Sequence, residues 1–208
     1  MVEARGVAFS QGQVVDDTKP LVLKEGQQVT LIAASGSVIK LRGPYEQAPA
    51  TEAAGSAVDV GSALAALTTK SDQRTNVAGV VRSKTEDVVL PNPWVVDVTH
   101  AGSACIREGD PIVFWRRNAA ESPTLTIMPA DRSWRAQAGW SAGNPTMVAP
   151  TGFPLRDRGT YLADLGGRPV GVTLNTIPHA VSNDRMQAAW MLEKGCVAQA
   201  EALLKTVR

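Results

Sequence analysis

The segment that most constrains the fold runs from Gly12 to Pro44, where short runs of β-prone residues alternate with turns. Gly26 and Gly36 fall in the turns between the runs, where glycine can adopt a positive φ angle without steric cost. The last run stops at Pro44, because proline cannot donate to a sheet ladder. The segment therefore predicts three or four short strands in tight succession, with apolar runs at 21–23, 28–33 and 38–41.

The order of these turns and strands resembles that of a known family. A glycine and a strand are followed by L-x-L-x-x-G, a strand, x-S-G-x-V, a strand and Gly-Pro, over Gly6 to Tyr45. This pattern resembles the FecR-type periplasmic β-domain, a stacked-hairpin module of bacterial envelope regulators. The resemblance implies a small β-module at residues 1–48 and a protein of the cell envelope.

The composition changes after this module. Residues 46–57 are rich in alanine, glycine and proline, as in a linker, and 58–67 has the composition of a short helix. Residues 71–86 are polar and charged, so we expect them to be exposed. The chain is thus predicted to divide into a FecR-like β-module at 1–48, a linker with a short helix at 49–87 and a second domain at 88–208.

The second domain returns to a β pattern. Its apolar, β-branched runs are punctuated by glycine and proline at a spacing typical of a β-sandwich. With one clear helix at the C-terminus, the fold class is predicted to be α+β, mainly β. The predicted strands are 94–98, 104–106, 111–115, 125–127 and 170–174.

Three landmarks of this domain resemble those of immunoglobulin-like domains. Trp115 lies ten residues after Cys105, and residues 157–161 have the D-x-G-x-Y form of a tyrosine corner that ends at Tyr161. Ala163 stands where such a domain has its second cysteine. The intersheet disulfide is therefore impossible, and the resemblance supports a sandwich-like domain only.

The C-terminal helix contains an interior glycine next to a cysteine. Ser182 or Asn183 can cap a helix that continues to the C-terminus with most of its apolar residues on one stripe. Gly195 costs about 1 kcal/mol in a helix interior, so a packing or covalent reason is expected. We predict a disulfide between Cys196 and Cys105, which would close a loop of about 91 residues and contribute roughly 4 to 5 kcal/mol.

Charge and hydropathy exclude two classes of partner. The formal net charge is +1 without a cluster of lysine and arginine, which argues against nucleic-acid binding. No run of 18 apolar residues is present, so no membrane span is expected. The start of the chain lacks a secretory signal, which fits either a cytoplasmic protein or a mature exported one; the two cysteines, the β-rich composition and the family resemblance favour the periplasm.

The candidate catalytic residues are sparse. His100 and Cys105 could form a base and nucleophile, but an offset of five on a strand sends their side chains to opposite faces. Ser103 lacks the second glycine of a nucleophile elbow, and His179 has no metal-ligand partner at helical spacing. We therefore predict no catalytic residue, no metal and no cofactor, and the alternative is a small hydrolase that uses Cys105 or Ser103 with His100.

Aromatic residues indicate a candidate binding surface. All five tryptophans lie at or after Trp94, and three of them fall in strand or helix patterns typical of a core. Trp134 and Trp140 fall in a loop-like stretch at 130–154, beside Arg132 and Arg135. Because long loops in compact domains tend to carry function, these four residues are the predicted anchors for binding.

The resulting functional prediction is a non-catalytic envelope or periplasmic protein that binds or scaffolds a protein or cell-wall partner. A structural subunit of a larger envelope assembly is a further alternative.

Overall fold

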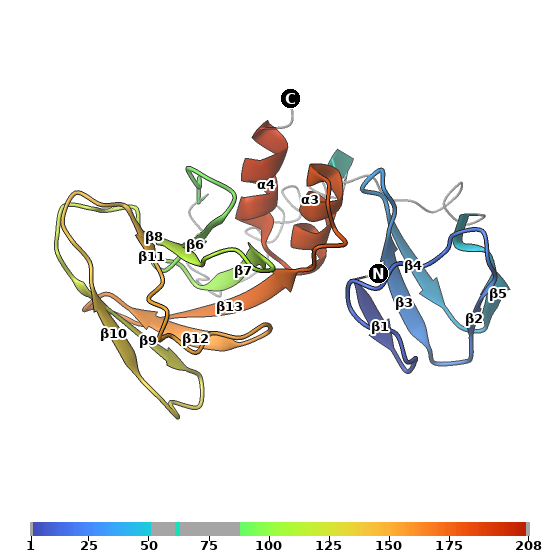
Figure 1. Cartoon of the computed structure of the whole chain (residues 1–208), viewed down its shortest axis with the longest axis horizontal. Coiled ribbons are helices and arrows are strands. Elements are labelled where there is room, and N and C mark those ends of the chain that lie inside the picture. The colour runs from blue at the N-terminus through green and yellow to red at the C-terminus, as the bar shows by residue number, and fades with distance from the viewer. Residues whose placement is uncertain (1, 51–60, 63–87, 207–208) are drawn as a thin grey trace, which may run out of the picture.

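The computed structural model describes residues 2–50, 61–62 and 88–206. It is mainly β, with a small N-terminal β-module, a larger C-terminal β-region and two C-terminal helices that lie between them (Figure 1). The predicted α+β, mainly β class is confirmed. The predicted linker and short helix at 49–87 lie largely outside the described residues.

The N-terminal module is built from antiparallel pairs. Strand β3 (Gln28–Ile32) lies between β1 (Glu3–Arg5) and β4 (Val38–Arg42), and β2 (Leu21–Leu23) pairs with β5 (Tyr45–Gln47). The three predicted runs form β2, β3 and β4, whereas β1 and β5 were not predicted, because their short polar sequences carry no β signal of their own. Alternate apolar residues point into one buried cluster: Leu21, Leu23, Val29, Leu31, Ile39 and Leu41.

The C-terminal region contains two sheets. The larger has the order β10-β9-β12-β13-β7, and the smaller has the order β11-β8-β6. Two neighbouring pairs, β13 with β7 and β6 with β8, are parallel, unlike the antiparallel sheets of an immunoglobulin sandwich. The strands are β6 (Val95–Asp97), β7 (Gly102–Arg107), β8 (Val113–Trp115), β9 (Thr124–Pro129), β10 (Ala136–Gly139), β11 (Thr146–Val148), β12 (Thr160–Asp164) and β13 (Val170–Ile177).

A buried cluster packs the two sheets against each other. Val96 and Phe114 of the smaller sheet share this cluster with Leu125, Tyr161 and Leu174 of the larger. The Arg156 backbone N–H donates to the Tyr161 hydroxyl at 2.7 Å, as a tyrosine corner requires. The region is therefore a two-layer, sandwich-like arrangement.

The C-terminus forms two helices, so the prediction of one continuous helix is wrong. Helix α3 (Asp184–Glu193) ends where Gly195 takes a φ of 78°, and α4 (Val197–Thr206) follows. The Cys196 N–H donates to the Met191 carbonyl and the Gly195 N–H to the Leu192 carbonyl. This is a Schellman motif, which stops a helix at a left-handed glycine.

The predicted long loop at 130–154 contains two edge strands, β10 and β11. Residues 136–139 read Ala-Gln-Ala-Gly, which has low β propensity, but they pair in register with β9. Tertiary pairing therefore overrides local preference in this stretch.

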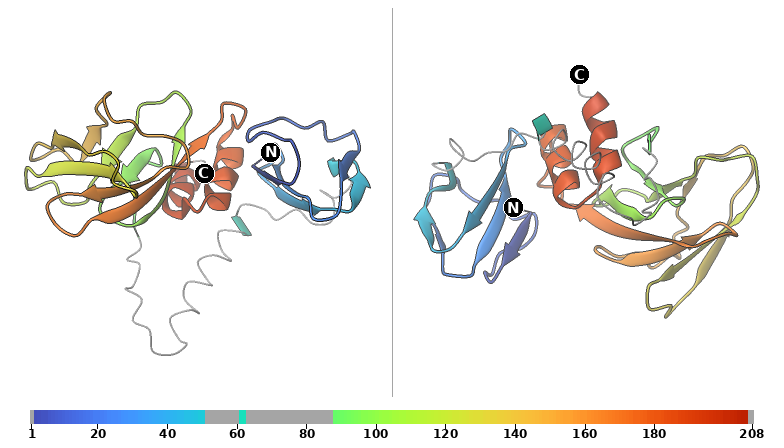
Figure 2. Two further views of the ribbon diagram at one scale, coloured as in Figure 1. Left: turned by 90° about the horizontal axis from the view of Figure 1, so that it is seen from below. Right: turned by 180° about the vertical axis from the view of Figure 1, so that it is seen from behind.

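The module and the C-terminal helices share a third cluster, in which Val2 and Val38 of the module pack with Trp190 of α3. Two polar contacts join the same elements. Lys40 Nζ lies 2.9 Å from Glu193 Oε2, and Asn183 Nδ2 donates to the Ala34 carbonyl at 3.1 Å. Figure 2 shows from two further sides that the module faces α3.

Candidate binding site

The predicted disulfide is present and pins the helices to the larger sheet. Cys105 of β7 is bonded to Cys196, the residue before α4, and both are buried. The buried Gln199 side chain reinforces the junction: its Oε1 accepts from the Cys105 N–H at 2.6 Å, and its Nε2 donates to the Cys105 carbonyl at 2.8 Å. A further 2.8 Å bond reaches the Pro93 carbonyl. Sequence reasoning missed Gln199, although a glutamine on an apolar helix stripe was the available signal.

His100 is held by its own turn. Its Nδ1 lies 2.7 Å from Asp97 Oδ2 and 3.0 Å from Thr99 Oγ1. Asp97 Oδ1 also accepts from the Thr99 N–H and hydroxyl. The arrangement is a hydrogen-bonded turn after β6, and it orients the imidazole toward groups within three residues.

The nucleophiles of the hydrolase alternative differ in availability. The Cys105 sulfur is part of a disulfide and has no exposed surface, so it cannot act as a nucleophile in this state. Ser103 is half-buried within β7, and its Oγ lies near Gly195. Within the described part of the chain, no three histidine, cysteine or acidic side chains come together as a possible metal site.

Three of the four predicted binding residues lie near the tip of the β9–β10 hairpin. Arg132 and Arg135 are exposed, and Arg132 has a φ of 55° in the turn. Trp134 is half-buried, with its ring 5.9 Å from that of Tyr161. The ring therefore packs partly on the core, and both arginines of this turn are exposed.

Trp140 is not a surface anchor, and this part of the prediction is wrong. Its side chain is 2% exposed, its indole N–H donates to the Asn144 carbonyl at 2.8 Å, and Arg116 stacks on its ring at 4.9 Å. Arg116 is itself 2% exposed and donates to the Ser141 carbonyl at 2.9 Å. Trp140 is thus part of the core of the C-terminal region. The neighbouring sequence, rich in glycine and serine, does not indicate this burial.

The structure contains a cavity that the sequence did not predict, between the module and α3. Its volume is about 380 Å³, within the range of small-molecule sites. The module lines one side with Val14, Leu31 and Ile39, and the C-terminal region lines the other with Val181 and Met186. Further lining residues include Val2, Val15, Ile32, Pro49, Ala180 and Trp190.

The rim of this cavity exposes apolar surface. Val14 is 79% exposed, the highest value among the exposed large hydrophobic residues of the described chain. Ala34 and Ala180, on opposite sides of the cavity, are also exposed. A ligand that covers these side chains would remove apolar surface from water, which is favourable.

One charged side chain, Asp17, stands among the described residues that line the cavity. The neighbouring Asp16 is engaged: its carboxylate accepts from the Thr18 hydroxyl at 2.6 Å and lies 3.1 Å from Lys19 Nζ. These interactions lower the pKa of Asp16, and the hydrogen bond from the Thr18 side chain contributes most. Asp17 is exposed, and its carboxylate has no hydrogen-bond or ion-pair partner within the described residues.

Trp190 forms the floor at the α3 side. It is fully buried, and its indole Nε1 has no hydrogen-bond partner among the described residues. Lys194 Nζ lies 5.5 Å from the ring centre, and burial lowers the pKa of this lysine. No sequence signal for the cavity was available, because its two walls come from segments more than 100 residues apart.

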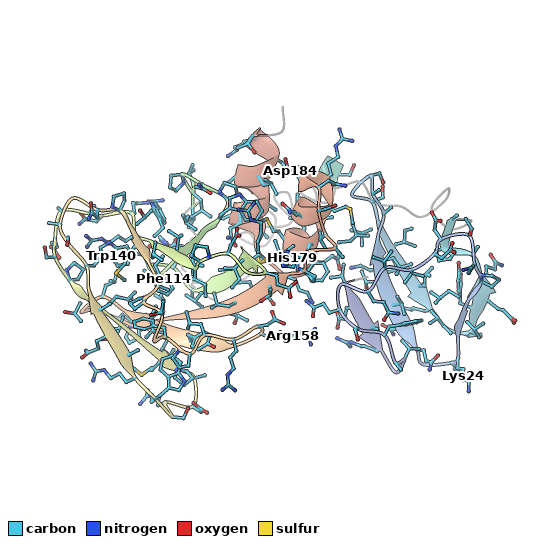
Figure 3. The ribbon with its side chains drawn as sticks, viewed as in Figure 1. Lys24, Phe114, Trp140, Arg158, His179 and Asp184 are labelled. Carbon is cyan, nitrogen blue, oxygen red and sulfur yellow. A yellow bond between two sulfur atoms is a disulfide. The ribbon has the colours of Figure 1, made fainter. Side chains whose placement is uncertain are left out.

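Figure 3 shows the side chains of both regions; His179, after β13, and Asp184, at the start of α3, lie on the side that faces the module.

No helix in the described ranges is long and apolar enough to cross a membrane. No protein-family model, curated protein or solved structure matches this chain.

Proposed function

We propose that this chain is a non-catalytic binding protein of the bacterial cell envelope, and that the cavity between the module and α3 holds a mainly apolar ligand. The cavity carries this proposal, because it combines a ligand-sized volume, apolar walls and an exposed apolar rim at Val14.

Two observations support the periplasm as its location. The Cys105–Cys196 disulfide is of a kind that persists in oxidising compartments. The FecR-like order of turns in the module is the second, since that β-domain occurs in envelope regulators.

The partner protein or cell-wall component predicted from the sequence would then contact the outside of the molecule. Arg132 and Arg135, exposed in the same turn as Trp134, offer donors for such a contact.

The cavity is tested with an apolar fluorescent probe, naphthylmethanol, and two filling variants. Val14→Trp and Ala180→Trp place a large ring at the cavity from its two opposite sides, and each should weaken probe binding at least tenfold. Val148→Trp is the matched control, because Val148 is also exposed, at 59%, and lies on β11 away from the cavity. Unchanged probe affinity in both filling variants would overturn the proposal.

A further inference from the structure

We infer that the ligand of this cavity carries a positive charge beside its apolar body, and that Asp17 receives this charge. The inference rests on the proposed function, since it names the chemical class of ligand that the same cavity takes.

Asp16 and Asp17 differ in the partners of their carboxylates. The two carboxylates are adjacent in sequence, yet only the Asp16 side chain pairs with Lys19 and with Thr18. Asp17 instead lines the cavity, where its backbone carbonyl accepts from the Ala50 N–H at 3.1 Å. This bond ties its backbone to the C-terminal end of the module and does not involve its carboxylate.

Asp17 is the one charged side chain among the described residues that line the cavity. Among the described residues that line the cavity, every neighbour of Asp17 is apolar, apart from Gln13. An exposed carboxylate at the edge of an apolar wall attracts a cation by a modest amount. An anionic ligand would meet the like charge of Asp17 in the cavity wall, which disfavours it.

The combination selects an amphiphilic cation. The apolar body would cover Leu31, Val181 and Met186, while an ammonium group at one end would reach the Asp17 carboxylate. A neutral ligand of the same shape would gain the burial without the ion pair.

A matched pair of probes tests this inference. Naphthylmethylamine and naphthylmethanol share ring and shape and differ in an ammonium group against a hydroxyl. The amine should bind about fivefold more tightly at low ionic strength, as expected for an ion pair at an exposed carboxylate. Added salt should reduce this advantage.

Asp17→Asn should bring the two affinities within twofold of each other and leave that of the alcohol unchanged. Asp16→Asn is the matched control and should keep the advantage of the amine, because Asp16 is paired with Lys19. The far-UV spectrum of each variant checks its fold.

The outcomes separate the two proposals. Equal affinities for amine and alcohol, both weakened by Val14→Trp, would overturn the charge inference and leave the cavity as the binding site. An amine advantage that survives Asp17→Asn would also overturn it. If neither probe binds, or if the filling variants change neither affinity, both proposals fail.

Discussion

The N-terminal module and the C-terminal region differ in the sequence distance between their partners. In the module, β3 and β4 pair across a short glycine turn, and every pair is antiparallel. In the C-terminal region, β7 lies parallel to β13, with three strands of the same sheet between them in the sequence. A local turn sets the register of β3 with β4, whereas the pairing of β7 with β13 needs long-range constraints whose closure costs more chain entropy.

The disulfide supplies the strongest of these constraints, and its removal should have the largest effect. Cys105→Ala with Cys196→Ala should lower the free energy of unfolding of the C-terminal region by about 4 kcal/mol, because the bond closes a loop of 91 residues. Tryptophan fluorescence in a denaturant titration measures this loss, since all five tryptophans lie in that region.

The module should respond far less to the same change. Amide hydrogen exchange at Leu31 and Leu41 reports on it, because both are buried there. Equal loss of protection in the two regions would show that they unfold as one unit and would contradict the comparison.

Gly43→Ala should destabilise the module more than the C-terminal region, which is the opposite of the effect of removing the disulfide. A Cβ at this position would lie 1.8 Å from the Lys24 carbonyl oxygen, a backbone atom that cannot move aside alone. The overlap should destabilise the module by about 3 kcal/mol, seen as lost exchange protection at Leu41, with a smaller change in tryptophan fluorescence.

Gly26→Ala is the control, because Gly26 also lies in a module turn, has a φ of 80° and has open space around it. It should cost only about 1 to 2 kcal/mol, from backbone strain. A larger cost at Gly26 than at Gly43 would show that backbone conformation rather than close approach controls the module.

The difference between local and long-range contacts also explains which features the sequence could predict. Strands β2, β3 and β4 of the module follow from glycine turns and period-two alternation, because both signals are local. The Cys105–Cys196 bond was predictable from an unusual glycine beside a cysteine, although the reason for Gly195 is the end of α3 rather than a helix interior. Strand β10, by contrast, has little β propensity and forms only because β9 is available to pair with it.

The candidate site was the least predictable feature. Composition placed Trp134 and Trp140 together on a surface loop, but Trp140 is buried because Arg116 and the Asn144 carbonyl satisfy it. The cavity depends on how the module packs against α3, and nothing in either segment alone indicates it. Long-range packing therefore determines the site, while short-range patterns determine the strands around it.

A third prediction concerns the hydrogen bonds that accompany the disulfide. Gln199→Leu should cost about 2 to 3 kcal/mol, because it leaves the buried N–H and carbonyl of Cys105 and the Pro93 carbonyl without their partner. Gln187→Leu is the matched control on α3, where the amide makes one bond, at 3.0 Å to the Val181 carbonyl, and should cost about 1 kcal/mol. Denaturant titration followed by tryptophan fluorescence measures the loss of stability in both variants. Equal losses would show that Gln199 does not act as a long-range constraint.

The smallest expected effect is at the turn between the two helices. Gly195→Ala should cost about 1 to 2 kcal/mol, because φ is 78° and an alanine Cβ is strained in that region. A Cβ there would also lie 3.4 Å from Ser103 Oγ, which is ordinary contact, so strain rather than collision sets the cost. Gly171→Ala, within β13 and with open space around it, should change stability by less than about 0.5 kcal/mol. If Gly195→Ala is as neutral as Gly171→Ala in the same denaturant titration, then the disulfide alone fixes the turn and the Schellman motif adds nothing to it.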